Sequence, residues 1–160
     1  MQIVLPDFLK KSGDFANVCS AVNDIMIIYK TKIYFFDCDP AGILFYARIF
    51  QICHSAYESM VDSFSLKEDY WNNTDYAVPI ISTEAKYLKP IKYGETVAIE
   101  LTIVQLWNSS FELGYLCKNE MDDVCVEIKT IHVFVDKQTW KKKEINEEVR
   151  AGLERIFNDS

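Results

Sequence analysis

Apolar residues recur about every 3.6 positions between residues 45 and 64, and every second position in the segments on either side. Helical spacing predicts one long amphipathic helix, whereas alternation predicts strands. One face of the predicted helix carries Phe45, Ile49, Ile52, Cys53, Ala56 and Met60. Such a broad apolar face predicts that the helix is buried against a sheet.

Five segments have the alternation typical of β-strands, namely residues 25–37, 79–88, 96–107, 111–119 and 124–135. Polar turn residues at 108–110 and 120–123 predict that the later strands pair as antiparallel hairpins. A second helix is expected from about Glu144, with Ile145, Val149, Leu153, Ile156 and Phe157 on one side. This order predicts an α+β domain in which an antiparallel sheet packs against one long helix.

The 160 residues are 49% hydrophobic, which is enough for a single domain with its own core. A formal net charge of −7 disfavours binding to nucleic acid or anionic lipid, and no apolar run is long enough to span a membrane. The first residues do not have the pattern of a secretory signal, and with five scattered cysteines we expect reduced thiols in the cytoplasm. Residues 1–24 are expected to form an N-terminal extension, helical or frayed, before a domain of residues 25–160.

The segment Phe-Asp-Cys-Asp-Pro-Ala-Gly-Ile-Leu-Phe-Tyr at 36–46 joins the first strand to the long helix. Pro40 ends the strand and Gly42 permits a tight turn, so the Asp39 carboxylate is expected beside the helix N-terminus. Unpaired N–H groups there can stabilise an oxyanion, and a carboxylate can attack an acyl carbon or activate water. The pattern suits hydrolysis of an activated acyl group, although an aspartate in this position also commonly caps a turn or helix.

The Asp-Cys-Asp-Pro-Ala-Gly-Ile block at 37–43, followed by Leu-Phe-Tyr-Ala, resembles the signature of the 4-hydroxybenzoyl-CoA thioesterase family of hotdog-fold proteins. The likeness extends over most of residues 32–135 and includes Leu-Lys-Pro-Ile-Lys-Tyr-Gly-Glu at 88–95. It implies the hotdog fold, an antiparallel sheet wrapped around one long helix. It further implies that Asp39 is the catalytic carboxylate and that the Tyr46 N–H polarises the thioester carbonyl. The family pairs two sheets edge to edge, so a homodimer or homotetramer is expected, with each active site at the dimer interface.

The resemblance also implies an acyl-CoA substrate, aromatic (hydroxybenzoyl or dihydroxynaphthoyl) or of medium length, and no cofactor. The candidate substrate-binding residues are Gly42, Phe45, His54, Lys89 and Lys92. The two lysines are expected to contact the phosphates of CoA. The hairpin Trp-Asn-Ser-Ser at 107–110 lacks the basic residues of the hydroxybenzoyl enzymes. The Cys-His-x-Ala-Tyr-Glu pattern at 53–58 is closer to the 1,4-dihydroxy-2-naphthoyl-CoA hydrolase branch.

Several alternatives remain open at this point. Asp39 could act as nucleophile or as general base, and Asp37 is interpreted as a positioning or turn residue. Cys38 lies between two acids, which disfavour its thiolate, so a packing role is expected. His54 and Glu58 are four residues apart and could touch, but they make no zinc site, and no metal is expected. The rival functions are a hotdog dehydratase or hydratase, which needs a paired histidine and acid, and a non-catalytic acyl-CoA binding module.

Overall fold

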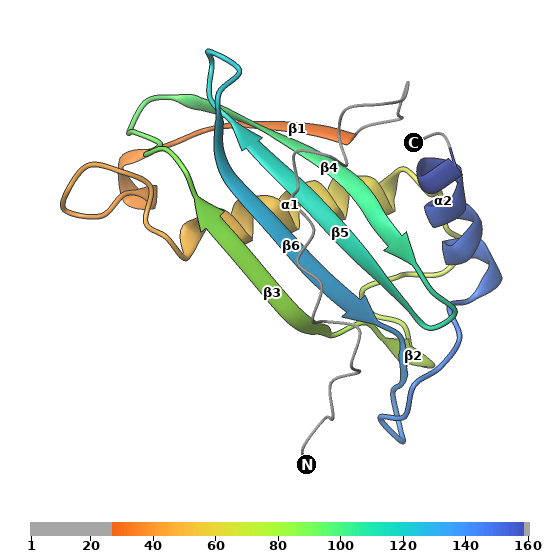
Figure 1. Cartoon of the computed structure of the whole chain (residues 1–160). Coiled ribbons are helices and arrows are strands. Elements are labelled where there is room, and N and C mark those ends of the chain that lie inside the picture. Colours follow the sequence, from red (N-terminus) through yellow and green to blue (C-terminus); the bar gives the residue numbers. More distant parts are fainter. Residues whose placement is uncertain (1–26, 159–160) are drawn as a thin grey trace.

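The computed structural model describes residues 27–158 of the chain. The predicted N-terminal extension of residues 1–24 therefore lies outside the described residues. A five-stranded antiparallel sheet in the order β1-β4-β5-β6-β3 forms the main layer (Figure 1). Its strands are β1 (Ile27–Lys32), β3 (Ile80–Tyr87), β4 (Thr96–Leu106), β5 (Ser110–Lys118) and β6 (Val124–Val133). Strands β2 (Tyr76–Ala77) and β7 (Val135–Asp136) form a separate antiparallel pair.

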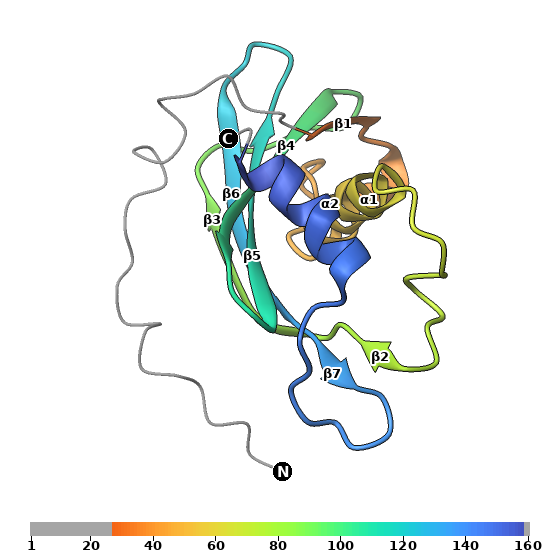
Figure 2. The same cartoon turned by 90° about the vertical axis from the view of Figure 1, so that its right-hand side faces the viewer.

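Both α-helices, α1 (Arg48–Asp62) and α2 (Glu147–Asn158), lie on the same side of the main sheet (Figure 2). The apolar residues predicted for the α1 stripe from Ile49 to Met60 are buried against the sheet. Helix α2 is attached to the β4–β5 turn by Arg150, whose guanidinium donates 2.9 Å hydrogen bonds to the carbonyls of Trp107 and Asn108. Among the described residues, neither helix is long and apolar enough to cross a membrane.

The register of the sheet defines which side chains face α1. One row of directly paired residues crosses all five strands, and it contains Tyr29, Ile99, Cys117, Val126 and Tyr87. This row faces the helix, because Cys117 Sγ lies 3.9 Å from Cys53 Sγ of α1. Tyr87, on the edge strand β3, therefore also lies on the helix side of the sheet.

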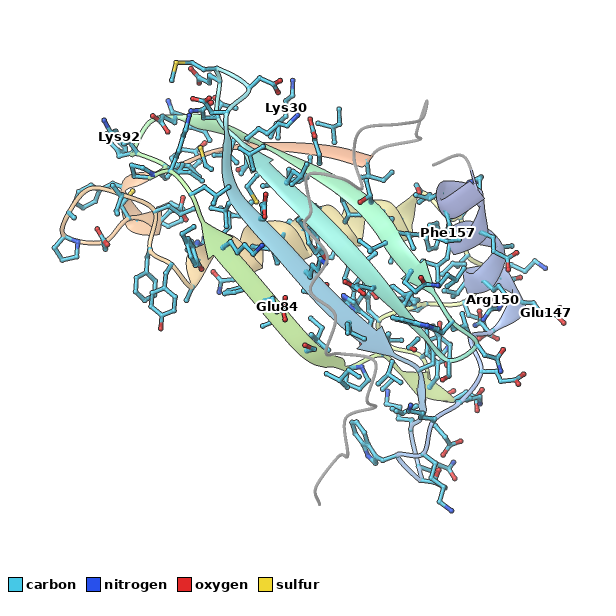
Figure 3. The ribbon with its side chains drawn as sticks, viewed as in Figure 1. Lys30, Glu84, Lys92, Glu147, Arg150 and Phe157 are labelled. Carbon is cyan, nitrogen blue, oxygen red and sulfur yellow. The ribbon has the colours of Figure 1, made fainter. Side chains whose placement is uncertain are left out.

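The opposite face of the sheet is more polar. Ion pairs connect its neighbouring strands, as between Lys118 and Glu100, 2.8 Å apart, and Glu84 projects from β3 on this side in Figure 3. This alternation of apolar and polar residues is what a sheet with one covered face requires. The four later strands and both hairpins agree closely with the sequence prediction, and the expected α+β architecture is confirmed.

The structure corrects the sequence prediction at several boundaries, and the second helix begins at Glu147 instead of Glu144. The first strand ends at Lys32 instead of residue 37, because Phe35–Asp37 form a 3₁₀ helix, η3, in which the Asp37 carboxylate accepts the Tyr34 N–H. Asp37 and Asp39 therefore do not share one face of a strand. Helix α1 begins at Arg48 instead of residue 45, because Leu44 and Phe45 donate their N–H groups to Ile91 and Asp37. These tertiary hydrogen bonds keep Leu44 and Phe45 out of the helix.

Candidate active site

The turn at residues 39–42 has a defined geometry. The N–H of Gly42 donates to the carbonyl of Asp39, and the N–H of Asp39 donates to the carbonyl of Ile43, both at 2.9 Å. The Asp39 carboxylate accepts the Ala41 N–H through Oδ1 at 2.8 Å. Gly42 has a φ of +75°, a left-handed conformation that glycine adopts without strain. The turn thus holds Asp39 in one orientation, half-buried.

Asp39 lines a cavity of about 450 Å³. The other lining residues are Ile43, Leu44, Phe45, Tyr46, Tyr87, Leu88, Lys89, Pro90, Ile91 and Val126. The walls are thus mainly apolar and aromatic, with one carboxylate and one ammonium group. In the described part of the chain, Asp39 forms no ion pair, and its Oδ2 atom has no hydrogen-bond partner. One carboxylate oxygen is therefore free to act on a molecule in the cavity.

The start of α1 lies beside this cavity. Its N-cap is Ala47, which has no side-chain group that could cap the helix. Within residues 27–158, the N–H groups of Tyr46 and Ala47 have no acceptor. Unpaired donors at the positive end of a helix can stabilise a negatively charged oxygen. Asp39 and Tyr46, nominated together from the sequence, thus line one cavity.

Asp37 lies outside this cavity. Its carboxylate is buried. It accepts a 2.6 Å hydrogen bond from Arg48 Nε of α1 and a 2.8 Å hydrogen bond from the Tyr34 N–H. Asp37 also accepts the N–H of Phe45 through its main-chain carbonyl at 2.9 Å. These contacts connect the segment before Asp39 to the segment that leads into α1, and the positioning or turn role of Asp37 stays a prediction.

Of the five predicted substrate-binding residues, Phe45 and Lys89 line the cavity. Gly42 shapes the turn without lining it. Lys92 pairs with Ile43 in an isolated β-bridge and lies at the same end of the molecule as the turn (Figure 3). His54 is not brought to the cavity in this chain. It lies on α1, where its Nε2 is 3.6 Å from Glu58 Oε1, and its ring contacts Trp71.

The remaining reactive side chains offer no second centre in the described residues. Burial and the carboxylates of Asp37 and Asp39 raise the pKa of the Cys38 thiol, which weakens it as a nucleophile. Residues 27–158 contain no group of three histidine, cysteine, aspartate or glutamate side chains that could hold a metal ion. His132 is enclosed in the core, where its ring stacks on Phe111.

Sequence reasoning did not nominate Tyr87, although its ring lines the cavity and its hydroxyl donates a 2.7 Å hydrogen bond to the Tyr46 carbonyl. The two residues are separated by 41 positions, and no local pattern links them. An aromatic residue at the end of an edge strand, just before Leu-Lys-Pro, is the only signal that the sequence carries.

Comparison with known proteins defines the class to which this fold and this cavity belong. Residues 33–153 match the model of the thioesterase-like superfamily. The chain belongs to that superfamily and has the hotdog fold expected from the Asp-Pro-Ala-Gly block.

Particular relatives agree with this assignment. The chain is 30% identical over 135 residues to a 1,4-dihydroxy-2-naphthoyl-CoA hydrolase of Crocosphaera subtropica, covering 82% of this chain and 98% of that protein. The crystal structure of a 1,4-dihydroxy-2-naphthoyl-CoA thioesterase from Synechocystis superposes with a TM-score of 0.75 at 25% identity, over 80% and 95% of the two chains. A Staphylococcus aureus protein in complex with CoA shares the fold, with a TM-score of 0.79, 12% identity, and 88% and 89% coverage.

Proposed function

We propose that this protein hydrolyses an aromatic acyl-CoA to the free acid and CoA. The observation that carries the proposal is that Asp39, with an unoccupied carboxylate oxygen, lines the same cavity as Tyr46, whose N–H has no acceptor in the described chain. A carbonyl oxygen held by that N–H would gain negative charge as the thioester carbon is attacked. The dipole of α1 stabilises the same charge.

Asp39 supplies the attacking group by one of two routes. Its carboxylate attacks the thioester carbon, expels CoA thiolate and forms an anhydride that water then hydrolyses. Alternatively, it removes a proton from a water molecule that attacks the carbon directly. Both routes use the same carboxylate and the same N–H group, so both predict that loss of the Asp39 charge greatly lowers kcat.

The lining of the cavity supports an aromatic acyl group over a short aliphatic one. Phe45, Tyr46 and Tyr87 present ring surfaces, and Leu88 and Pro90 add apolar contacts. A volume of about 450 Å³ is within the usual range for a small-ligand site. The names of the relatives add support for a bicyclic aryl group, and a medium-length acyl chain is the competing substrate.

Lys89 is our candidate for a phosphate contact of CoA. It lines the cavity, half of its side chain is exposed, and its ammonium is 2.8 Å from the Asp123 carboxylate, whose pKa it lowers. A lysine held at a cavity rim in this way can exchange its carboxylate partner for a phosphate oxygen. Lys92, exposed near the turn, is a second candidate.

We further propose that two copies pair through β3, which lies at one end of the strand order and has an unpaired edge in the described chain. Because Tyr87 belongs to β3 and lines the cavity, the cavity would then lie beside the interface between the two copies. Light scattering of the purified protein measures whether it forms this homodimer, or a tetramer built from it. The four described cysteines are free thiols, which supports a cytoplasmic location.

The test is a thiol-release assay with purified protein over naphthoyl, hydroxybenzoyl and aliphatic CoA thioesters. We expect the highest kcat/KM for an aryl thioester. Hydration of an enoyl thioester without release of CoA would instead assign the chain to the hydratases. Saturable acyl-CoA binding without any free thiol would assign it to the non-catalytic binding proteins.

A further inference from the structure

The hydroxyl of Tyr87 and the main-chain carbonyl of Tyr46 form a 2.7 Å hydrogen bond. This bond connects the last residue of β3 to the segment just before α1. Building on the thioesterase function above, we propose that Tyr87 is a positioning residue of the active site. Its hydroxyl holds the peptide between Tyr46 and Ala47, and thereby orients the N–H groups that stabilise the oxyanion.

The peptide concerned lacks the support that a regular helix would give it. Tyr46 precedes the N-cap Ala47, and α1 has no side-chain cap. The Tyr46 carbonyl receives its hydrogen bond from Tyr87. In a trans peptide the carbonyl and the N–H point in opposite directions, and the described residues contain no cis peptide bond. Fixing the Tyr46 carbonyl therefore fixes the direction of the Ala47 N–H, which belongs to the same peptide. It also restricts rotation about the main-chain bonds of Tyr46, which connect this peptide to the Tyr46 N–H.

Tyr87 is itself well placed to act as an anchor. Its position in the sheet is set by pairing with Val126, which also lines the cavity, and Val126 pairs in turn with the buried Cys117. Partial burial raises the pKa of the Tyr87 phenol, with smaller contributions from Tyr46 and the nearby thiols. The hydroxyl thus remains protonated at neutral pH and able to donate. Tyr87 has two separable roles, since its ring forms part of the cavity wall and its hydroxyl holds the peptide.

The variant Tyr87→Phe removes the hydroxyl and keeps the ring. Removal of a direct oxyanion donor typically lowers kcat by 10²- to 10³-fold, so a loosened donor should have a smaller effect, of about tenfold. We expect kcat to fall by about tenfold and KM to change by less than about twofold, because the wall that contacts the acyl group is retained. An unchanged kcat, or a rise in KM alone, would overturn the positioning role.

Tyr29→Phe is the matched control. Tyr29 lies in the same cross-strand row at the opposite edge of the sheet, and its hydroxyl has no hydrogen bond among the described residues. This variant should retain the kcat of the unmodified protein. An equal fall in kcat for both variants would show that loss of any tyrosine hydroxyl from this row is sufficient, and would contradict the proposal.

A second measurement is independent of activity. Hydrogen bonding to the Tyr46 carbonyl affects the amide nitrogen of the same peptide, which belongs to Ala47. In ¹⁵N-labelled Tyr87→Phe we expect the Ala47 amide signal to shift, while amides of α2 such as Leu153 stay in place. An unmoved Ala47 signal would overturn the proposal even if kcat fell. If the unmodified protein released no thiol from any thioester, the proposed function would fail instead, so the two failures are distinguishable.

Discussion

Arg48, the first residue of α1, contacts the buried carboxylate of Asp37 through its Nε atom at 2.6 Å. A cation at a helix N-terminus is unfavourable for the helix dipole unless another group compensates for it. Here Asp37 provides the compensation, and the contact connects η3 to α1 through two residues that do not line the cavity. The ion pair thus stabilises the segment that presents Asp39 and Tyr46.

Replacement of Arg48 by methionine should therefore destabilise the protein, because it leaves the Asp37 charge buried without its cation. We expect a loss of about 1–3 kcal/mol in the free energy of unfolding, which urea titration measures. The double variant Asp37→Asn/Arg48→Met should recover part of that loss. A double variant as unstable as the sum of the two single variants would show that the residues do not interact.

Gly152 of α2 packs directly against Phe64, which follows α1. A Cβ atom at residue 152 would lie 2.4 Å from Cγ of the Phe64 ring, closer than atoms can approach. Gly152→Ala should therefore lower the free energy of unfolding by about 1–3 kcal/mol, although alanine is the better helix former. Phe64→Ala in the same chain removes the Cγ and Cδ atoms that the new Cβ would meet, so the combined variant should be more stable than additivity predicts. A single Gly152→Ala variant more stable than the unmodified protein would contradict this packing.

The burial of His132 leads to a prediction of how the free energy of unfolding depends on pH. Burial, with a smaller contribution from His54, lowers the pKa of His132 to about 3, and its Nε2 is 2.8 Å from Thr130 Oγ1. In the unfolded chain a histidine titrates near pH 6.5. Between these values the unfolded chain binds more protons, so the stabilisation by neutral His132 is complete above about pH 6.5 and declines as the pH falls toward 3.

The slope contributed by His132 is at most about 1.4 kcal/mol per pH unit. In His132→Phe, which keeps a ring against Phe111, this contribution should disappear. Urea titrations of both proteins at pH 7, 6 and 5 give the slope of the free energy of unfolding against pH for each. Because the carboxylates are the same in both proteins, their contribution cancels in the difference between the two slopes. Identical slopes would show that His132 is equally protonated in the folded and unfolded chains.

Lys89 is expected to act in binding rather than in chemistry. Lys89→Met should raise KM for the acyl-CoA by about tenfold, because a charge-assisted contact to phosphate is lost, with little change in kcat. The same variant should show an unchanged KM for the acyl group carried on N-acetylcysteamine, which has no phosphate. Lys67→Met is the control, since Lys67 forms a comparable ion pair, 3.1 Å from Glu148, away from the cavity. An equal rise in KM for both thioesters would place the role of Lys89 in the acyl site.

The sequence was sufficient to predict most of the fold, because one sheet face and one helix stripe are buried continuously and leave a clear period. The 3.6-residue spacing from Ile49 to Met60 identifies α1, and the alternation in β4 identifies its buried face. The entry to α1 was predicted less well. Phe45 belongs to the apolar pattern of the predicted helix, but the hydrogen bond from its N–H to the Asp37 carbonyl keeps it outside α1. Periodicity does not detect competition of this kind.

In the candidate site, too, local features were predicted and contacts between distant segments were not. The local pattern placed the Asp39 carboxylate beside a helix N-terminus, and the resemblance to the thioesterase family assigned the roles of Asp39 and Tyr46, which lie on the same short segment. Tyr87 joins them through a hydrogen bond between segments far apart in the chain, which requires the register of β3. His54 shows the converse, because its position on the helix pattern suggested the pocket, whereas its ring packs toward Tyr57 and Trp71.

The role of Asp39 is tested most directly by comparing Asp39→Asn with the unmodified protein in the thiol-release assay on the preferred aryl-CoA. We expect kcat to fall by at least about 100-fold, with an unchanged melting temperature and a similar KM. Asp62→Asn, which removes an exposed carboxylate at the end of α1, should be fully active. An Asp39→Asn variant with the turnover of the unmodified protein would remove Asp39 from the mechanism and contradict the proposed reaction.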